Sequence, residues 1–317
     1  MQIFLTGGTG YVGAAVAAAM REAGHEVYGL ARSAAAADRL GRAGVRPVLG
    51  SLADPAAWAA AATAADAVVH AGFEYDETGR ERRDVDERAT AALLDAARAG
   101  LAADGRPRTV VYTSNGYLLR SNGGPPLDES ADVHAAPTPP SWRFAVEARV
   151  LDAGAVPGSA LTTAVVRPGL VYGGYATFGL GGSAPSLFAA ARASGAGAYA
   201  GDGAARLSFV HVRDLATLYR RVVEARGAGV FHGVDGVPLT AHEAGRVAGE
   251  AAGSGAAARA ATGDDATRLL GAHTVDIMQR DVALLPARGR ALGWMPAVPS
   301  FRDGAAAAHA EWSALVA

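Results

Sequence analysis

The sequence contains no lysine, so all 29 basic residues among its 317 are arginine. A chain without lysine cannot form a Schiff base, hold a phosphate through a P-loop lysine, or pass a proton through a lysine amine, because arginine stays protonated. The sequence also contains no cysteine. Disulfides, thiolate nucleophiles and cysteine-based zinc sites are therefore excluded.

Other absences narrow the function further. The net charge of −2 carries no basic excess, which argues against a nucleic-acid partner. No apolar run approaches the length of about 18 residues that a membrane span needs, and no basic segment precedes a long apolar run at the start. We therefore expect no membrane partner and a cytoplasmic protein. The histidines show no metal-binding spacing and no G-x-S-x-G motif occurs, so we predict no metal site and no serine hydrolase.

Short β-rich runs alternate with alanine-rich helical stretches along the first half of the chain. This alternation predicts an α/β fold, and the nearly continuous apolar character of the runs is typical of a parallel sheet covered on both faces. The predicted strands are residues 2–6, 26–31, 46–49, 66–70, 108–113 and 161–166. The predicted helices are residues 11–23, 34–43, 54–62, 80–100 and 141–154.

A glycine-rich stretch, TGGTGYVG at residues 6–13, lies between the first predicted strand and the first predicted helix. In this context Gly7 allows a tight turn, Gly10 lets the backbone approach a pyrophosphate, and Gly13 lets the helix pack closely on the strand. The helix N-terminus adds free N–H groups and a partial positive charge. The stretch therefore predicts a binding loop for NAD(P).

The residues at the end of the second predicted strand indicate whether the cofactor is NAD(H) or NADP(H). An acidic residue about 20 residues past the loop binds the ribose 2′-hydroxyl of NAD. Here the strand ends in Arg32 and Ser33, which suit a 2′-phosphate. We therefore predict NADP(H) in preference to NAD(H).

The alternation of predicted strands and helices becomes less regular after about residue 167. We predict a dinucleotide-binding domain over residues 1–167, to which residues 207–233 return. Residues 168–206 and 234–317 are expected to form a smaller, interleaved C-terminal substrate lobe. The predicted fold class is therefore a Rossmann-type, doubly wound parallel sheet with this lobe attached.

Six motifs follow one another in a characteristic order. They are TGGTGYVG (6–13), ADAVVHAG (65–72), VVYTS (110–114), VVRPGLVYGG (165–174), SFVHVRDLA (208–216) and LGWMP (292–296). With these motifs the whole chain resembles the extended short-chain dehydrogenases/reductases of the NAD-dependent epimerase/dehydratase type. The resemblance implies a homodimer through residues 86–100 and 141–154, which the sequence does not distinguish from a monomer.

The resemblance also implies which residues contact the dinucleotide. Ser51 and Leu52 stand where the family usually carries Asp-Leu at the adenine, so one usual contact is missing. Arg143 is implied to bind the ribose. The other implied contacts are Thr6, Gly7, Thr9, Gly10, Tyr11, Val12, Gly13, His70, Ala71, Gly72, Thr113, Pro168, Gly169, Leu170 and Val171.

The resemblance fails at the family's catalytic Ser and Tyr-x-x-x-Lys. Asn115 stands at the serine position. If Glu147 matches a glutamate that often follows the lysine, Arg143 takes the lysine position and Pro139 the tyrosine position. If the alignment is shifted by one helical turn, Arg143 and Glu147 take the tyrosine and lysine positions instead. Neither register gives the usual pair, so the chain resembles the atypical members that keep the glycine loop and lack the usual active-site residues.

Three residues near this position are candidate catalytic groups. Arg143 can add positive charge but cannot relay a proton. Asn115 can donate a hydrogen bond to a substrate carbonyl, or it can cap a turn. Tyr117 is a candidate acid if nearby positive charge lowers its pKa, and aromatic packing is the alternative.

Other polar residues follow the predicted strands. One of Glu74, Tyr75 and Asp76 can act as acid or base, but for these residues we favour a solvated loop. For Tyr172 we favour plain packing. For His211 we favour capping of the following helix.

Three functions remain open. The first is an NADP(H)-dependent oxidoreductase that reduces a carbonyl or conjugated double bond. The second is a non-redox dehydratase, isomerase or cyclase, and the third is an NADP-binding sensor without catalysis. Because Arg192 and Arg206 are the only basic residues in 173–206, the expected substrate is a small, fairly apolar molecule rather than a nucleotide sugar.

Overall fold

The computed structural model describes residues 1–75, 82–135, 138–139, 141–255 and 257–317. The chain divides into two compact units. Unit 1 comprises residues 1–114, 141–166 and 216–231, and unit 2 comprises residues 115–140, 167–215 and 232–317.

Unit 1 is built on a seven-stranded sheet with the order β11-β6-β5-β4-β1-β2-β3, in which the pairs from β6 to β3 are parallel. Its strands are β1 (Gln2–Thr6), β2 (Glu26–Ala31), β3 (Arg46–Leu49), β4 (Ala67–His70), β5 (Arg108–Thr113), β6 (Leu161–Pro168) and β11 (Gly229–Gly233). The last residues of β6 and β11 belong to unit 2. Ile3, Phe4 and Leu5 are fully buried, as expected for a strand covered on both faces.

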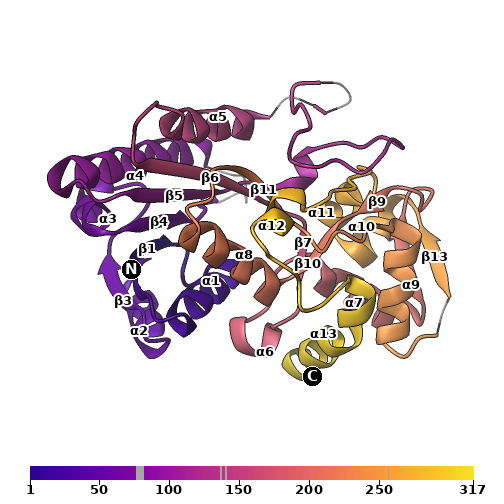
Figure 1. Cartoon of the computed structure of the whole chain (residues 1–317). Helices are drawn as coiled ribbons and strands as arrows, with labels where there is room; N and C mark the ends of the chain where they lie inside the picture. The colour runs from indigo at the N-terminus through magenta and orange to yellow at the C-terminus, as the bar shows by residue number, and fades with distance from the viewer. Residues whose placement is uncertain (76–81, 136–137, 140, 256) are drawn as a thin grey trace. The chain divides into compact units, whose positions relative to one another are not determined.

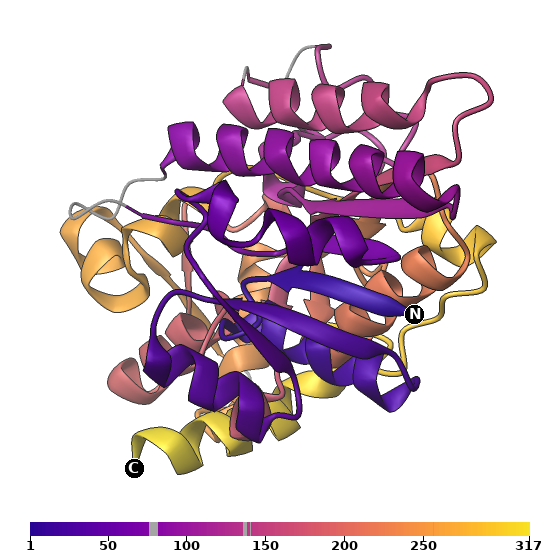
Figure 2. The ribbon, with the colours of Figure 1, turned by 90° about the vertical axis from the view of Figure 1, so that its left-hand side faces the viewer.

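Helices cover both faces of this sheet. They are α1 (Tyr11–Glu22), α2 (Ala34–Arg42), α3 (Ala59–Ala64), α4 (Arg83–Asp104), α5 (Trp142–Gly154) and α8 (Val212–Glu224). Within unit 1, α1 and α8 lie on one face and α4 and α5 on the other (Figure 1). Figure 2 shows α4 and α5 packed side by side over the strands. The predicted Rossmann-type, doubly wound sheet is confirmed.

The six predicted strands are confirmed to within two residues, and one predicted helix is not continuous. Instead of a helix over 54–62, a 3₁₀ turn (Pro55–Ala57) precedes α3. Trp58 between them departs from helical geometry (φ −129°, ψ −6°), and its ring is buried against Phe4 with 5.8 Å between the ring centroids. Its indole N–H donates to the Ser51 carbonyl over 2.9 Å.

Unit 2 contains two-stranded sheets and short helices. Its sheets pair β10 (Phe209–His211) with β7 (Leu170–Tyr172), β12 (Leu239–Thr240) with β9 (Arg206–Leu207), and β13 (Ala258–Ala261) with β8 (Gly197–Ala200). Its helical elements are η2 (Gly116–Leu118), α6 (Tyr175–Phe178), α7 (Ala184–Ser194), α9 (Ala241–Ala251), α10 (Gly263–Leu270), α11 (Ala272–Ile277), α12 (Ala287–Ala291) and α13 (Phe301–Val316).

The two units differ from the predicted domains in two segments. Residues 115–140 and 207–215 both belong to unit 2. The second segment was expected to rejoin the main sheet, but its strand β10 pairs with β7 over Phe209 to His211 instead. The strand that does rejoin the sheet is β11, a short run between glycines where no strand was predicted.

Unit 2 contains a buried acidic group. Asp235 is 3 % exposed, and its Oδ1 accepts the Val237 N–H over 2.8 Å. Burial, together with the charges of Asp214 on α8 and Asp303 on α13, raises the pKa of Asp235 from 3.8 to about 7, although the N–H groups of Val237 and Phe301 oppose the shift. The carboxyl is therefore held in its neutral form up to neutral pH.

This raised pKa predicts how stability depends on pH. The folded protein holds the Asp235 proton more tightly than the unfolded chain does, so the stabilisation is complete below about pH 4 and is lost as the pH rises through about 7. The Asp235→Asn variant mimics the neutral form, so urea unfolding at pH 8 should give it a free energy of unfolding about 2–4 kcal/mol above wild type. Equal pH dependence in this variant and in the exposed control Asp202→Asn would contradict the assignment.

Among the described helices, none combines the length and the apolar character that a membrane crossing requires.

Candidate functional site

The glycine loop joins β1 to α1 and packs against the end of β4. Gly7 has a φ of +74°, and a Cβ there would lie 2.4 Å from the Ala71 carbonyl oxygen. A Cβ on Gly13 would lie 2.1 Å from the Gly7 carbonyl oxygen. Only glycine fits at these two positions, because both contacts are with backbone atoms that cannot move aside.

Gly10 is different, because the protein itself leaves room there. Its N–H donates to the Gly7 carbonyl over 2.8 Å, and a Cβ would meet only that oxygen, at 3.3 Å. Gly10 is also the N-cap of α1, where no side chain makes a capping hydrogen bond. A Cβ at this position would point into a cleft that Gly10 lines. The loop is therefore suited to an anionic ligand that approaches the helix N-terminus closely.

This cleft lies wholly within unit 1 and has a volume of about 290 Å³. It follows the carboxyl ends of β1, β2, β3 and β4, the edge at which parallel α/β sheets bind ligands. The lining residues are Gly7, Thr9, Gly10, Leu30, Arg32, Arg39, Gly50, Ser51, Leu52, Ala71, Gly72, Phe73 and Glu74. Nine of these lining residues were predicted or discussed from the sequence. The cleft brings the glycine loop together with the ends of three further strands.

One end of the cleft is basic. Arg32 follows β2, and Arg39 lies on α2; both are exposed, and neither has an ion-pair partner among the described residues. Ser33 does not line the cleft, and its hydroxyl accepts the Ala36 N–H over 3.2 Å as the N-cap of α2. Arg39 was not predicted from the sequence, and it lies on α2 rather than at the strand end that carries Arg32.

The floor of the cleft is held by hydrogen bonds from β1 to β4. The Thr6 hydroxyl accepts the Gly72 N–H over 3.0 Å and shares a hydrogen bond of 2.6 Å with His70 Nδ1. Both Thr6 and His70 are buried and do not line the cleft. The two residues therefore support the Ala71–Gly72 backbone from beneath.

A buried polar group lies behind the cleft wall. The Tyr112 hydroxyl donates to Asp86 Oδ2 over 2.9 Å and accepts from Arg143 Nη1 over 3.4 Å. The Arg143 guanidinium lies over the rings of Phe73 and Trp142, at 4.2 and 4.7 Å from their centroids. Since Phe73 lines the cleft, Arg143 stands directly behind its wall.

Glu147, one turn after Arg143 on α5, is also buried and accepts a hydrogen bond from the Ser114 hydroxyl. Burial, and next the negative charge of Asp86, raises the pKa of Tyr112 far above its ordinary value, although Arg143 opposes this. Tyr112 therefore stays protonated at neutral pH. Neither Tyr112 nor Asp86 was predicted from the sequence as part of a site, because only the packing of α4 against β5 brings them together.

The other predicted catalytic residues lie elsewhere. Tyr75, in unit 1, is 62 % exposed and packs edge-on against Phe73, with 5.5 Å between the ring centroids. Asn115 and Tyr117 belong to unit 2. The Asn115 side-chain oxygen accepts the Tyr117 N–H over 3.1 Å, and the Tyr117 ring packs against His273. Asp76 lies outside the described residues.

The remaining predicted contacts are also divided between the units. In unit 1, Thr113 shares a hydrogen bond of 2.7 Å with the Tyr219 hydroxyl. In unit 2, a Cβ on Gly169 would lie 2.4 Å from the Ser208 carbonyl oxygen. Pro168, Leu170 and Val171 are buried beside it. Tyr11 and Val12 are half-buried in the first turn of α1.

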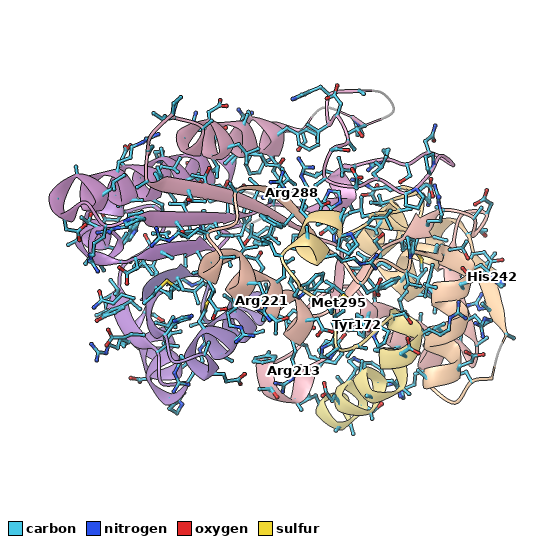
Figure 3. All side chains as sticks on the ribbon, in the orientation of Figure 1. Tyr172, Arg213, Arg221, His242, Arg288 and Met295 are labelled. Carbon is cyan, nitrogen blue, oxygen red and sulfur yellow. The ribbon has the colours of Figure 1, made fainter. Side chains whose placement is uncertain are left out.

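Two predictions on single side chains of unit 2 are confirmed. Tyr172 (Figure 3) is fully buried, packs edge-on against Phe301 at 4.9 Å and donates to the Ser300 carbonyl over 3.0 Å, as expected for plain packing. His211 Nδ1 accepts the Arg213 N–H over 3.3 Å at the start of α8, as expected for a cap. Within the part of the chain that the structure describes, no cluster of His, Asp and Glu is arranged to hold a metal ion.

The sheet topology, the glycine loop and the cleft at the strand ends define an α/β protein with a Rossmann-type fold. Residues 3–232 match the model of the NAD dependent epimerase/dehydratase family, and the chain belongs to this family.

Known proteins resemble this chain over nearly its whole length. The 3-diazoavenalumate denitrifying reductase of a Streptomyces species is 31% identical, over 96% of this chain and 99% of that protein. The human epimerase family protein SDR39U1, solved with NADPH, has a TM-score of 0.74 at 22% identity and covers 98% of this chain and 99% of its own. The Thermus thermophilus UDP-glucose 4-epimerase, solved with NAD, has a TM-score of 0.74 at 20% identity and covers 99% of both chains.

Proposed function

We propose that this protein is an NADP(H)-dependent oxidoreductase that reduces a carbonyl or conjugated double bond of a small, fairly apolar molecule. The observation that carries the cofactor assignment is the basic end of the cleft. Two exposed guanidiniums, of Arg32 and Arg39, line it without an ion-pair partner among the described residues. A 2′-phosphate supplies the negative charge that such a pair lacks, and a free ribose 2′-hydroxyl does not.

The cleft fits the rest of a dinucleotide as well. Gly10 presents no side chain to it, and the first turn of α1 carries no side-chain cap, so this helix N-terminus suits the pyrophosphate. Ser51 and Leu52 line the cleft beside Arg32, where they would contact the adenine. Ala71 and Gly72 would lie under the ribose and nicotinamide.

The bound cofactor would supply a hydride, and the chain's own residues would orient the substrate and balance charge. Arg143 keeps its positive charge behind the cleft wall and cannot release a proton. We do not propose Tyr112 as the acid, because it is buried, does not line the cleft and donates a hydrogen bond to Asp86. Asn115 and Tyr117 stay the candidates that the sequence offers for a hydrogen-bond donor and an acid, and the Asn115 side-chain oxygen accepts the Tyr117 N–H.

Reduction is favoured over the other chemistries of the family by the curated relative. The Streptomyces protein, which this chain covers to 99%, is named a reductase. A chain without lysine also lacks the residue on which the family's usual alcohol dehydrogenases depend. We therefore place this protein among the atypical reductases of the family.

The proposal is tested with purified wild-type protein. Titration followed by nicotinamide fluorescence is expected to show NADPH binding at least tenfold more tightly than NADH. Loss of absorbance at the NADPH band should then follow the addition of a member of a panel of aromatic ketones, aldehydes and enones. Tighter binding of NADH would contradict the NADP assignment. Conversion of a substrate without stoichiometric loss of NADPH would instead identify a non-redox enzyme.

A further inference from the structure

We propose that Tyr112 and Asp86 are positioning residues, which hold the Arg143 guanidinium against the wall of the cofactor cleft. This inference rests on the proposed function, because the guanidinium matters only if the cleft binds the dinucleotide. It assigns a role to two buried side chains for which the sequence predicted none.

The hydroxyl of Tyr112 is the link between the two charged groups. It lies 2.9 Å from Asp86 Oδ2 and 3.4 Å from Arg143 Nη1. A carboxylate only accepts hydrogen bonds and a guanidinium only donates them. The direction of both bonds is therefore fixed. The single hydroxyl of Tyr112 bridges the carboxylate of Asp86 and the guanidinium of Arg143. All three side chains are at least 93% buried, so water does not screen the interaction.

Aromatic rings fix the plane of the guanidinium. Arg143 lies 4.2 Å from the centroid of Phe73 and 4.7 Å from that of Trp142. Ring contacts allow the guanidinium to slide within its plane, whereas a hydrogen bond fixes its direction. The Tyr112 hydroxyl supplies that direction. Because Phe73 itself lines the cleft, a displaced guanidinium would move the cleft wall with it.

Asp86 also reaches the floor of the cleft. Its Oδ1 lies 3.5 Å from His70 Nε2, and His70 Nδ1 shares a 2.6 Å hydrogen bond with Thr6. Thr6 in turn accepts the N–H of Gly72, which lines the cleft. One carboxylate on α4 therefore supports both the floor and the wall of the same cleft.

Stability alone does not account for this carboxylate. The 3.5 Å contact between Asp86 Oδ1 and His70 Nε2 is not a hydrogen bond, Oδ1 makes none with any other described residue, and the side chain is 3% exposed. Burying a charged group in this way opposes folding. We therefore assign it a role in the geometry of the cleft.

The test compares three variants of the full-length protein by titration with NADPH. Tyr112→Phe deletes only the linking hydroxyl and is expected to raise the Kd for NADPH about tenfold. Asp86→Asn keeps an acceptor for the Tyr112 hydroxyl and is expected to raise the Kd by about threefold or less. The control is Thr90→Val. Thr90 lies on α4 one helical turn from Asp86, and the substitution removes a buried hydroxyl that has no part in the contacts of Tyr112, Asp86 and Arg143. Its Kd should stay within about twofold of wild type.

Thermal unfolding of each variant separates positioning from stability. We expect Tyr112→Phe and Thr90→Val to unfold at similar temperatures, while only the former loses NADPH affinity. If Tyr112→Phe binds NADPH as tightly as Thr90→Val does, the positioning role is overturned and the proposed function stands. If the wild-type protein binds no NADPH, the proposed function is overturned and this inference with it.

Discussion

Replacing Gly13 by alanine should destabilise the protein by about 3 kcal/mol, the upper range for a side chain forced into a packed site. A glycine-to-alanine substitution in a helix normally raises the free energy of unfolding by about 1 kcal/mol, whereas here we expect it to fall. Here the new Cβ would lie 2.1 Å from the Gly7 carbonyl oxygen, and both atoms belong to the backbone. The loop or α1 would have to shift to relieve this contact. Urea unfolding measures the loss directly.

Two alanine variants serve as controls for this prediction. A Cβ added to Gly41 on α2 would have no atom within 4 Å, so Gly41→Ala should be neutral or raise stability by up to about 1 kcal/mol. Gly10→Ala should change stability by no more than about 1 kcal/mol, the scale of an N-cap substitution. It should nevertheless weaken NADPH binding at least tenfold, because its methyl group would occupy the cleft. Equal unfolding midpoints for Gly13→Ala and Gly41→Ala would disprove the steric account.

Removing Arg32 and Arg39 together should abolish the preference for NADPH. A hydrogen bond to a charged group is worth about 1.5–3 kcal/mol, so losing two such contacts should weaken NADPH binding by a factor of about 100 or more. NADH lacks the 2′-phosphate, and its affinity should change by less than about threefold. The measurement is a pair of titrations, with NADPH and with NADH, for Arg32→Ala, Arg39→Ala and the double variant.

A matched control separates recognition from general electrostatic attraction. Arg42 is exposed at the end of α2 and does not line the cleft, so Arg42→Ala should leave the ratio of the two affinities unchanged. The wild-type preference should also weaken as salt is added, because both guanidiniums are exposed. A double variant that loses affinity for NADH and NADPH equally would show that these arginines do not read the 2′-phosphate.

The parts of the site that sequence could predict are those set by local geometry. The spacing of Gly7, Gly10 and Gly13 follows from the sterics of one strand-to-helix turn, which a short motif contains in full. Arg32 was found in the same way, at the end of an identifiable strand. Arg39 was missed because its relevance depends on which side of α2 faces the cleft.

The buried group behind the cleft wall could not be derived from sequence spacing. Asp86 and Tyr112 are 26 residues apart and meet only because α4 packs across β5. The seventh strand, β11, was missed for a related reason. Its five residues begin and end with glycine and carry no clear strand pattern, so its place in the sheet depends on partners from elsewhere in the chain.

Because the two units are interleaved in the sequence, they limit how this protein can be truncated or recombined. The chain passes from one unit to the other after residues 114, 140, 166, 215 and 231. Neither unit is a continuous stretch of sequence, so no single truncation can yield one of them whole. Exchanging unit 2 with the corresponding part of a relative would require several simultaneous grafts. New specificities are therefore more accessible through point substitutions in individual loops than through recombination of whole domains.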